Sequence, residues 1–292
     1  MASVNPTEPL VASDIRITDP EFRRFCDFFY RRTGIVFGDT QRVYVDRRLA
    51  DCIVAAGSRG FAEHFARLLV EPREMERLIS LFTVNETYFY REEYQLRCLT
   101  STLLDGIVAR KRIGQPVRLW SMPCSTGEEP YSIAIWLLEN WAEVDRWDIE
   151  IIGSDIDTKV LEAAEAGEYS ERALMRLPRP LVDKYFTRIG DKRYRIDEGL
   201  RGSVQFSRVN VIDQAEMARW RGIDVVFCRN MLIYFDEVSR RTAAGNLYDS
   251  LAPGGYICLG HTESMSRISP LFEVRRFPDA IVYQKPEEGG HA

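Results

Sequence analysis

Two adjacent glutamates lie in a short polar turn, where the chain changes from a strand-like to a helix-like pattern. The segment RLWSMPCSTGEEPYSIAI begins with a short apolar run and ends with a helical apolar stripe. Between them stand one glycine, Gly127, and the carboxylates of Glu128 and Glu129. In a parallel α/β sheet such a turn lies at the carboxyl end of a strand, where these sheets bind ligands. The glutamates therefore serve either the local structure or a binding site.

The structural interpretation is a helix cap. Ser125 and Glu128 fit the spacing of a capping box, as do Thr126 and Glu129, and Pro130 suits a first helical turn. Acidic side chains at this position also interact favourably with the helix dipole. This segment alone does not decide between a cap and a binding site.

The binding interpretation follows from the charge of the turn. A dinucleotide site holds a pyrophosphate on helix amides and needs several glycines, so the pattern after Trp120 disfavours a dinucleotide oxidoreductase. Two carboxylates would repel phosphate and attract a cation. S-adenosylmethionine carries both an ammonium and a sulfonium. In this interpretation Gly127 lets the backbone approach the ligand, and a carboxylate binds its positive charge.

A second carboxylate follows the next apolar run, in IIGSDID. Asp155 stands where nucleotide-binding sheets present an acid to ribose hydroxyls. The alternative is that Asp155 or Asp157 caps the following helix. Together, the two acidic strand ends favour an adenosyl ligand without phosphates.

Two further segments carry polar side chains at suggestive positions. In LFTVNETYFYREEYQL, Asn85, Thr87 and Arg91 alternate with aromatic residues. This segment is either a simple connector or a polar wall of the cofactor cleft, in which Arg91 pairs with the ligand carboxylate. In VVFCRNMLIYFD, Asn230 ends an apolar run and Tyr234 follows. Asn230 either satisfies loop amides or binds the cofactor or a substrate carboxyl group.

The elements that would position these residues fall into two regions. Helical patterns with caps and apolar stripes occupy the first ninety residues, beginning with a helix from Asp19 to Gly34. From about Pro116, apolar runs alternate with helical segments, which predicts a mostly parallel sheet covered on both faces. The last two runs lack a long helix between them and predict an antiparallel end of the sheet. Between about Tyr169 and Asn210, short strands with turns at Gly190-Asp191 and Glu198-Gly199 predict an inserted antiparallel subdomain.

The composition excludes several classes of protein. The 292 residues carry a net charge of −5, which disfavours a nucleic-acid-binding surface. The six cysteines and three histidines are scattered, so no metal site is predicted, and a reducing cytoplasm is the expected location. No apolar run is long enough to span a bilayer, so direct membrane insertion is not expected.

Five ordered motifs together resemble the chemotaxis receptor methyltransferases, the CheR family. They are NETYFYRE, WSMPCSTGEEPYSIA, SDIDTKVLEAAEAGEY, FCRNMLIYFD and LAPGGYICLGHTES, and the similarity runs from about residue 19 to 284. The resemblance implies a helical N-terminal domain, residues 14–90, before a Rossmann-like class I methyltransferase domain, residues 91–286. The small antiparallel subdomain would occupy about residues 169–210. The implied activity is S-adenosylmethionine-dependent O-methylation of protein glutamates, which yields glutamyl methyl esters and S-adenosylhomocysteine.

The resemblance also implies roles for individual residues. Glu129 would bind the methionine ammonium, Asp155 the ribose, and Tyr234 would lie near the reacting methyl, with Asn230 beside it. The remaining cofactor contacts implied by the motifs are Asn85, Thr87, Arg91, Asn210, Val211, Asn230 and Met231.

The partner implied is the cytoplasmic helical domain of a chemoreceptor. Arg42, Arg47 and Arg48 would form a basic dock for it, although a solvated helix face is the more common explanation of such residues. The stretch between Phe186 and Phe206 is shorter than in relatives that bind a receptor's C-terminal pentapeptide, which argues against such tethering. Two other functions remain open: a non-catalytic module that binds S-adenosylmethionine or its product, and a carboxyl methyltransferase for a non-receptor protein.

Overall fold

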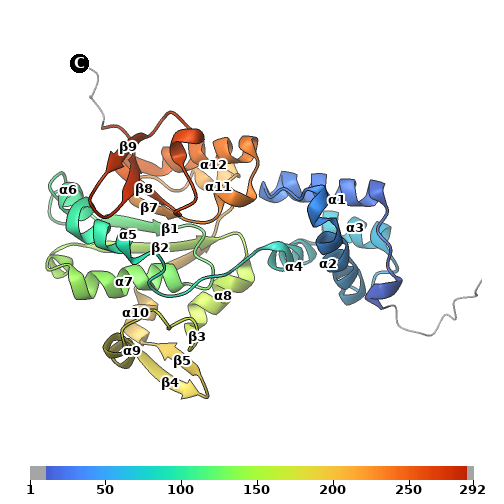
Figure 1. Ribbon diagram of the computed structural model, residues 1–292, viewed down its shortest axis with the longest axis horizontal. Coiled ribbons are helices and arrows are strands. Elements are labelled where there is room, and N and C mark those ends of the chain that lie inside the picture. The colour runs from blue at the N-terminus through green and yellow to red at the C-terminus, as the bar shows by residue number, and fades with distance from the viewer. Residues whose placement is uncertain (1–10, 288–292) are drawn as a thin grey trace, which may run out of the picture. The chain divides into compact units, whose positions relative to one another are not determined.

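The computed structural model describes residues 11–287 and divides between Thr83 and Val84 into two compact units (Figure 1). The described part of the first unit is helical. Its helices are α1 (Asp19–Thr33), α2 (Arg42–Ala55), α3 (Phe61–Val70) and α4 (Pro72–Phe82), with short 3-10 turns at Ala12–Asp14 and Asp39–Gln41.

The residues at both ends of helix α1 explain where it begins and ends. The Thr18 side chain accepts a hydrogen bond from the Glu21 amide, Glu21 bonds back to Thr18, and the helix ends at Gly34 in the left-handed conformation. Its buried face carries Phe25 and Phe29, as the spacing predicts. These rings lie 5.3 and 5.4 Å from the ring of Phe82 on α4, which makes an aromatic core for the unit.

The second unit is built on one seven-stranded sheet in the order β6-β2-β1-β7-β8-β10-β9. The first five strands in that order are parallel, and β10 and β9 are antiparallel additions, as predicted for the end of the sheet. The strands are β1 (Val117–Ser121), β2 (Ile149–Asp155), β6 (Val204–Arg208), β7 (Ile223–Cys228), β8 (Leu251–Leu259), β9 (Glu273–Arg276) and β10 (Ile281–Gln284).

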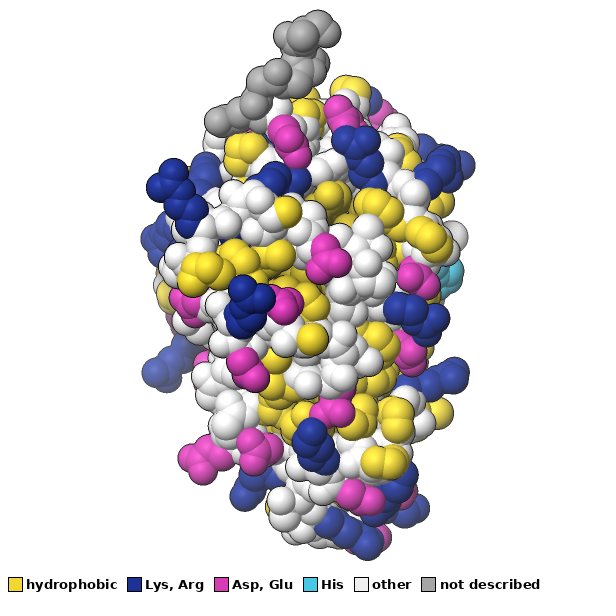
Figure 2. Space-filling view, turned by 90° about the vertical axis from the view of Figure 1, so that its left-hand side faces the viewer, with side chains coloured by type: hydrophobic (Ala, Val, Ile, Leu, Met, Phe, Trp, Pro, Cys, Tyr) yellow, Lys and Arg dark blue, Asp and Glu magenta, His cyan; other side chains and the backbone are white. Residues whose placement is uncertain are grey.

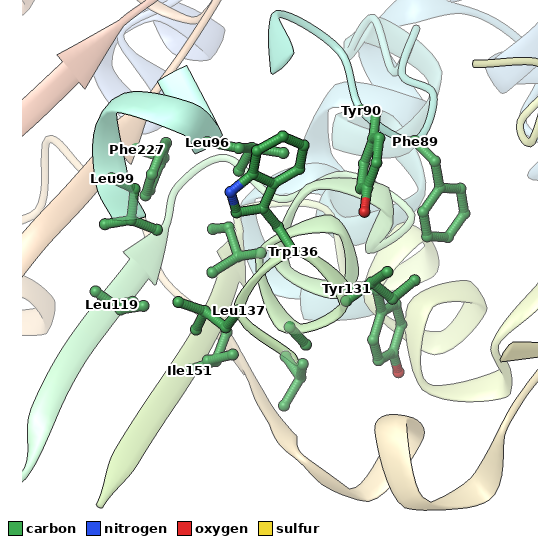
Figure 3. Close-up of a cluster of buried hydrophobic side chains, with 14 of the residues drawn as sticks. Phe89, Tyr90, Leu96, Leu99, Leu119, Tyr131, Trp136, Leu137, Ile151 and Phe227 are labelled. Atoms are coloured by element: carbon green, nitrogen blue, oxygen red, sulfur yellow. The ribbon is translucent and has the colours of Figure 1, made fainter. Parts of the chain in front are cut away.

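Helices cover the sheet because its strands are apolar on both faces. They are α5 (Glu93–Cys98), a π-helical turn (Leu99–Leu103), α6 (Leu104–Val108), α7 (Glu128–Asn140), α8 (Thr158–Ala166), α11 (Gln214–Met217) and α12 (Glu237–Ser250). Figure 3 shows Leu137 of α7 beside Leu119 and Ile151 on neighbouring strands, and Trp136 of the same helix next to Leu96. This packing fixes the carboxyl ends of β1 and β2 relative to the start of α7.

The inserted subdomain is a separate three-stranded antiparallel sheet in the order β3-β5-β4. It contains β3 (Glu168–Ser170), α9 (Arg179–Tyr185), β4 (Phe186–Gly190), β5 (Arg193–Ile196) and α10 (Glu198–Gly202). The turn predicted at Gly190-Asp191 lies between β4 and β5, whereas the turn predicted at Glu198-Gly199 is wrong, because both residues belong to α10.

The insertion is also shorter than the predicted residues 169–210. Strand β6 pairs with β2 in parallel and so belongs to the main sheet. Its alternating pattern resembled a hairpin strand because an edge strand buries mainly one face. Gly153 permits this pairing: a Cβ there would lie 2.7 Å from the ring of Phe206.

The sequence pattern placed the division between the units at residue 90, but it falls earlier, between Thr83 and Val84. Phe89 donates its amide to the carbonyl of Ala173 at 2.9 Å, and Tyr90 donates to Ser132 Oγ at 3.0 Å. Both aromatic side chains lie in the hydrophobic core of the second unit. The NETYFYRE segment therefore belongs to the α/β unit.

Across residues 11–287, no helix combines the length and the low charge needed to cross a bilayer. Within the same range, no group of three or more His, Cys, Asp or Glu side chains is placed to hold a metal ion.

Candidate functional site

A narrow cavity of about 60 Å³ lies in the second unit at the carboxyl ends of β1, β2 and β7, and we call it the strand-end cavity. Six of the residues predicted from the sequence line it: Asn85, Thr87, Arg91, Glu129, Asp155 and Asn230. Ligand pockets usually hold about 300–1,000 Å³. The segment from Val84 to Arg91 forms one wall of this small cavity.

The other predicted site residues, three cofactor contacts and the catalytic Tyr234, do not line this cavity. Asn210 is buried, and its side-chain oxygen accepts from the Ile212 amide at 3.3 Å. The carbonyl of Val211 accepts from Asn246 Nδ2 at 2.8 Å. Met231 and Tyr234 follow Asn230, and Tyr234 is 36% exposed in the 3-10 turn Leu232–Tyr234. The structure thus places these four outside the lining.

The acidic turn is not a capping box. The N-cap of α7 is Gly127, with a left-handed φ of 91° and no side-chain cap, and Thr126 Oγ1 donates to Glu128 at 2.6 Å instead. Because the helix starts after Gly127, Ser125 and Thr126 lie outside it. Gly127 does not line the strand-end cavity, and a Cβ there would lie 2.9 Å from Ala164 Cβ, so the glycine permits close contact with α8. The approach of its backbone to a ligand stays a prediction.

Glu129 belongs to a buried ionic network. Arg229 Nη1 donates to Glu129 Oε2 at 2.7 Å, and Ser121 Oγ donates to Glu129 Oε1 at 2.7 Å. The other guanidinium nitrogen, Arg229 Nη2, lies 3.3 Å from Glu92 Oε2 and donates to the carbonyl of Arg91 at 2.7 Å. Burial raises the pKa of Glu129, and the Arg229 charge opposes that rise.

Arg229 was not identified from the sequence. It is only 7% exposed, and it is the shared partner of two carboxylates from distant segments. Its Nε has no hydrogen-bond partner among residues 11–287. The cavity lining therefore holds a buried carboxylate, Glu129, next to a buried guanidinium. That pair of groups suits a ligand with a zwitterionic amino-acid end.

Asp155 accepts two backbone hydrogen bonds. Its Oδ2 accepts from the Ser125 amide at 2.9 Å and its Oδ1 from the Asp157 amide at 3.0 Å. The bond from Ser125 joins the ends of β1 and β2, and burial raises the pKa of Asp155 to about 6. The cap of α8 is Asp157, whose side chain accepts from the Lys159 amide, so the capping alternative is confirmed for Asp157 and not for Asp155.

Asn230 is held in a left-handed conformation, with a φ of 58°. Glu263 Oε2 accepts from the amides of Asn230 at 2.7 Å and Gly260 at 2.9 Å, and Glu263 Oε1 accepts from the Leu232 amide at 2.8 Å. Glu263 lies within the LGHTES motif, but its spacing from Asn230 gave no sign of this contact. Its function is to position the loop that carries Asn230.

Left-handed non-glycine residues gather around the strand-end cavity. Ser125 and Asn230 line it, and Tyr90 and Glu92 lie on the connector at its wall, all with φ between 49° and 59°. Such conformations persist where the surrounding structure imposes them, which is common at functional sites.

Two family models cover most of the chain. Residues 85–281 match the SAM-binding domain of the CheR methyltransferases, and residues 20–83 match their all-alpha domain. The chain belongs to the CheR methyltransferase family. A Vibrio cholerae protein named chemotaxis protein methyltransferase 2 is 46% identical, over 95% of this chain and 96% of its own length. A Pseudomonas aeruginosa protein of the same name is 33% identical, over 93% and 96% of the two chains.

The family assignment makes the protein a SAM-dependent methyltransferase with a class I, Rossmann-like sheet. The chemistry of the strand-end cavity fits S-adenosylmethionine. Glu129 and Arg229 line it with opposite charges, which would suit the two charges of its methionine part, and the buried Asp155 carboxylate would accept from its ribose hydroxyls. No phosphate-binding group is needed. The two acidic strand ends of a CheR protein thus have a common explanation.

We expect the affinity for S-adenosylhomocysteine to fall as the pH is lowered through about 6. Burial raises the pKa of Asp155 to about 6, so its carboxylate gains a proton on acidification. Ribose hydroxyls would donate to the ionised form, so binding would favour deprotonation. Well below that pKa, the dissociation constant should rise roughly tenfold per pH unit. Calorimetry between pH 5 and 8 measures this, and Asp155→Asn should remove that part of the dependence; an equal slope in the variant would contradict it.

Proposed function

We propose that this protein transfers the methyl group of S-adenosylmethionine to glutamate side chains on the cytoplasmic helices of chemoreceptors. The main support is its similarity, over nearly its whole length, to the Vibrio cholerae chemotaxis protein methyltransferase 2. The products would be glutamyl methyl esters and S-adenosylhomocysteine. The reaction removes negative charge from the receptor and would thereby alter its signalling.

The reaction needs no general base from the protein. A solvent-exposed glutamate side chain has a pKa of about 4.3, so the acceptor is already an anion at neutral pH and needs no general base. When bound, S-adenosylmethionine supplies the electrophilic methyl group. The chain's own residues hold the acceptor carboxylate in line, and orientation of this kind can contribute roughly 7–11 kcal/mol.

Two side chains would position the acceptor carboxylate, and a third would bind the cofactor. Asn230, fixed by Glu263, lines the strand-end cavity and would face the acceptor carboxylate. Tyr234, half-exposed one turn later, would complete its positioning. Arg91 would stay with the cofactor, because an arginine bound to the acceptor would weaken its attack.

Tyr234→Phe should lower kcat more than it lowers affinity for the cofactor. The hydroxyl would act on the acceptor carboxylate, whereas the ring and the backbone turn remain. Steady-state kinetics with a purified receptor domain, beside calorimetry with S-adenosylhomocysteine, separates the two effects. Equal losses in both would assign Tyr234 to cofactor binding.

The proposed receptor dock is on α2 of the first unit. Arg47 is exposed and Arg48 half-buried, with its guanidinium 5.0 Å from the Tyr44 ring. Arg42 is committed within the unit, since it pairs with Asp19 at 2.8 Å and Asp46 at 2.7 Å. The dock would therefore depend on Arg47 and Arg48.

Arg47→Glu/Arg48→Glu should raise the KM for receptor several-fold at low salt and much less at high salt, because surface charges are screened within about 10 Å at 0.1 M. The kcat and the cofactor affinity should remain at wild-type values. Methylation assays at two ionic strengths measure this. An unchanged KM at low salt would remove these arginines from the dock.

The proposed function is tested by incubating the protein with methyl-labelled S-adenosylmethionine and receptor domain. Label that is released as methanol by mild base identifies carboxyl methyl esters, and a Glu→Gln exchange at the labelled receptor positions should abolish it. Cofactor binding without transfer to any protein would instead support a non-catalytic module. Base-labile label on another protein only would support a different carboxyl methyltransferase.

A further inference from the structure

A second cavity, of about 480 Å³, lies in the α/β unit between α5, the loop after β8 and the turn between β9 and β10. We call it the hairpin cavity. Tyr94 and Gln95 line it from α5, Gly260 from the loop, and Phe277 and Asp279 from the turn. Its volume lies within the range of ligand sites. None of the residues assigned above to the cofactor lines it.

The two cavities share a wall. Gly260 lines the hairpin cavity and Asn230 the strand-end cavity, and a Cβ on Gly260 would lie only 2.8 Å from Asn230 Nδ2. Glu263 binds the amides of both residues. Only Gly260 therefore separates a group bound in the hairpin cavity from Asn230, the side chain proposed to face the methyl acceptor.

The polar groups of the hairpin cavity are mainly acceptors. Gln95 is 2% exposed and donates through Nε2 to the Leu259 carbonyl at 2.6 Å, while its Oε1 has no partner among residues 11–287. The Tyr94 hydroxyl donates its proton to Glu92 Oε2 at 3.0 Å. No lysine or arginine lines the cavity, and the lining His261 is itself bonded to Glu92. An unsatisfied buried acceptor calls for a donor.

The lining also provides charge and rings of the kind that bind a cation. The Asp279 carboxylate has weak partners, since Ser101 Oγ lies 3.4 Å away and Arg97 Nη1 lies 3.9 Å away. Phe277 and Tyr283 join Tyr94 as aromatic lining. Aromatic faces attract cations, and a planar guanidinium also stacks on them and donates through five N–H groups.

We propose that the hairpin cavity binds an arginine side chain of the protein substrate and so anchors the substrate beside the methyl-transfer site. The acceptor glutamate and the anchored arginine would belong to the same helical partner. Figure 2 shows one face of the molecule, on which hydrophobic side chains lie between separate acidic and basic ones. The proposal rests on the proposed function only in taking the acceptor to be a protein.

Binding of N-acetyl-arginine amide to the full-length protein, saturated with S-adenosylhomocysteine and followed by NMR chemical shifts, tests the site directly. N-acetyl-citrulline amide has nearly the same shape without the charge, and it should bind at least about tenfold more weakly, because charge-assisted bonds are roughly twice as strong as neutral ones. Asp279→Asn should weaken arginine binding about tenfold. Asp105→Asn, an exposed change outside the cavity, should leave it unchanged.

Steady-state kinetics with the receptor domain then test whether the hairpin cavity binds the protein substrate. Asp279→Asn should raise the KM for receptor several-fold with little change in kcat or cofactor affinity. Equal binding of the arginine and citrulline amides, or wild-type arginine binding by Asp279→Asn, would overturn the proposal even where the receptor is methylated. A protein that binds the arginine amide as predicted but methylates no glutamate would refute the proposed function and leave the arginine site in place.

Discussion

Replacing Arg229 with methionine is expected to lower the free energy of unfolding of the second unit by about 3–5 kcal/mol, the cost of breaking a buried ion pair from one side. The guanidinium is 2.7 Å from Glu129 Oε2 and 3.3 Å from Glu92 Oε2. Methionine fills much of the space but leaves both carboxylates without their counter-charge. Urea unfolding, followed by the fluorescence of the tryptophans, which all lie beyond residue 119, measures the loss.

Two comparisons make the Arg229 experiment specific. Arg229→Met/Glu129→Gln removes one of the uncompensated charges and should be less destabilised than Arg229→Met alone. Arg118→Met breaks a pair with Glu150, but Arg118 is 38% exposed, so its cost should stay below about 1 kcal/mol. Equal losses for Arg118→Met and Arg229→Met, or no relief in the double variant, would refute the importance of the buried network.

Asp155→Ala is expected to weaken binding of S-adenosylmethionine and S-adenosylhomocysteine by at least about 100-fold. Two hydrogen bonds from ribose hydroxyls to a charged group, at about 1.5–3 kcal/mol each, amount to at least that factor. The effect should appear in calorimetry at pH 7.5, where the carboxylate is ionised because its pKa is about 6. The rise in Kd should be similar for substrate and product, since both contain the ribose.

The control for Asp155→Ala must account for the two backbone amides that the carboxylate also accepts. Asp197→Ala removes an acidic side chain that accepts from the amides of Gly199 and Leu200 at the start of α10, away from the strand-end cavity. It should lose some stability and keep its cofactor affinity. A folded Asp155→Ala protein that binds within threefold of the wild type would exclude the ribose contact.

Much of the architecture could be predicted because it depends on local patterns. Uninterrupted apolar runs separated by helices indicated the parallel sheet, and strand ends pointed to Glu129, Asp155 and Asn230, which the fold brings to one cavity. The sequence pattern failed at β6, where one-sided burial at a sheet edge looks the same as a hairpin strand. It also gave no sign that a Cβ at Gly127 would meet Ala164 across the packing of two helices.

Contacts between distant segments were beyond the reach of sequence patterns. Arg229 and Glu92 are 137 positions apart in the numbering, and Glu263 serves the Asn230 amide from a separate loop. An arginine or a glutamate after a strand is most often solvated. Only the three-dimensional fold selects which of them is buried and which partner it has. The shared wall at Gly260 was hidden for the same reason.

The left-handed residues around the strand-end cavity bear on how this protein would respond to selection for heat resistance. A non-glycine residue in that conformation costs roughly 1–2 kcal/mol, more than the extra chain entropy that glycine loses on folding. Glycine at Ser125, whose φ angle is 49°, would relax the backbone at that point. Laboratory evolution towards thermostability should therefore enrich glycine there. The resulting proteins should have a higher Tm and a lower affinity for S-adenosylmethionine.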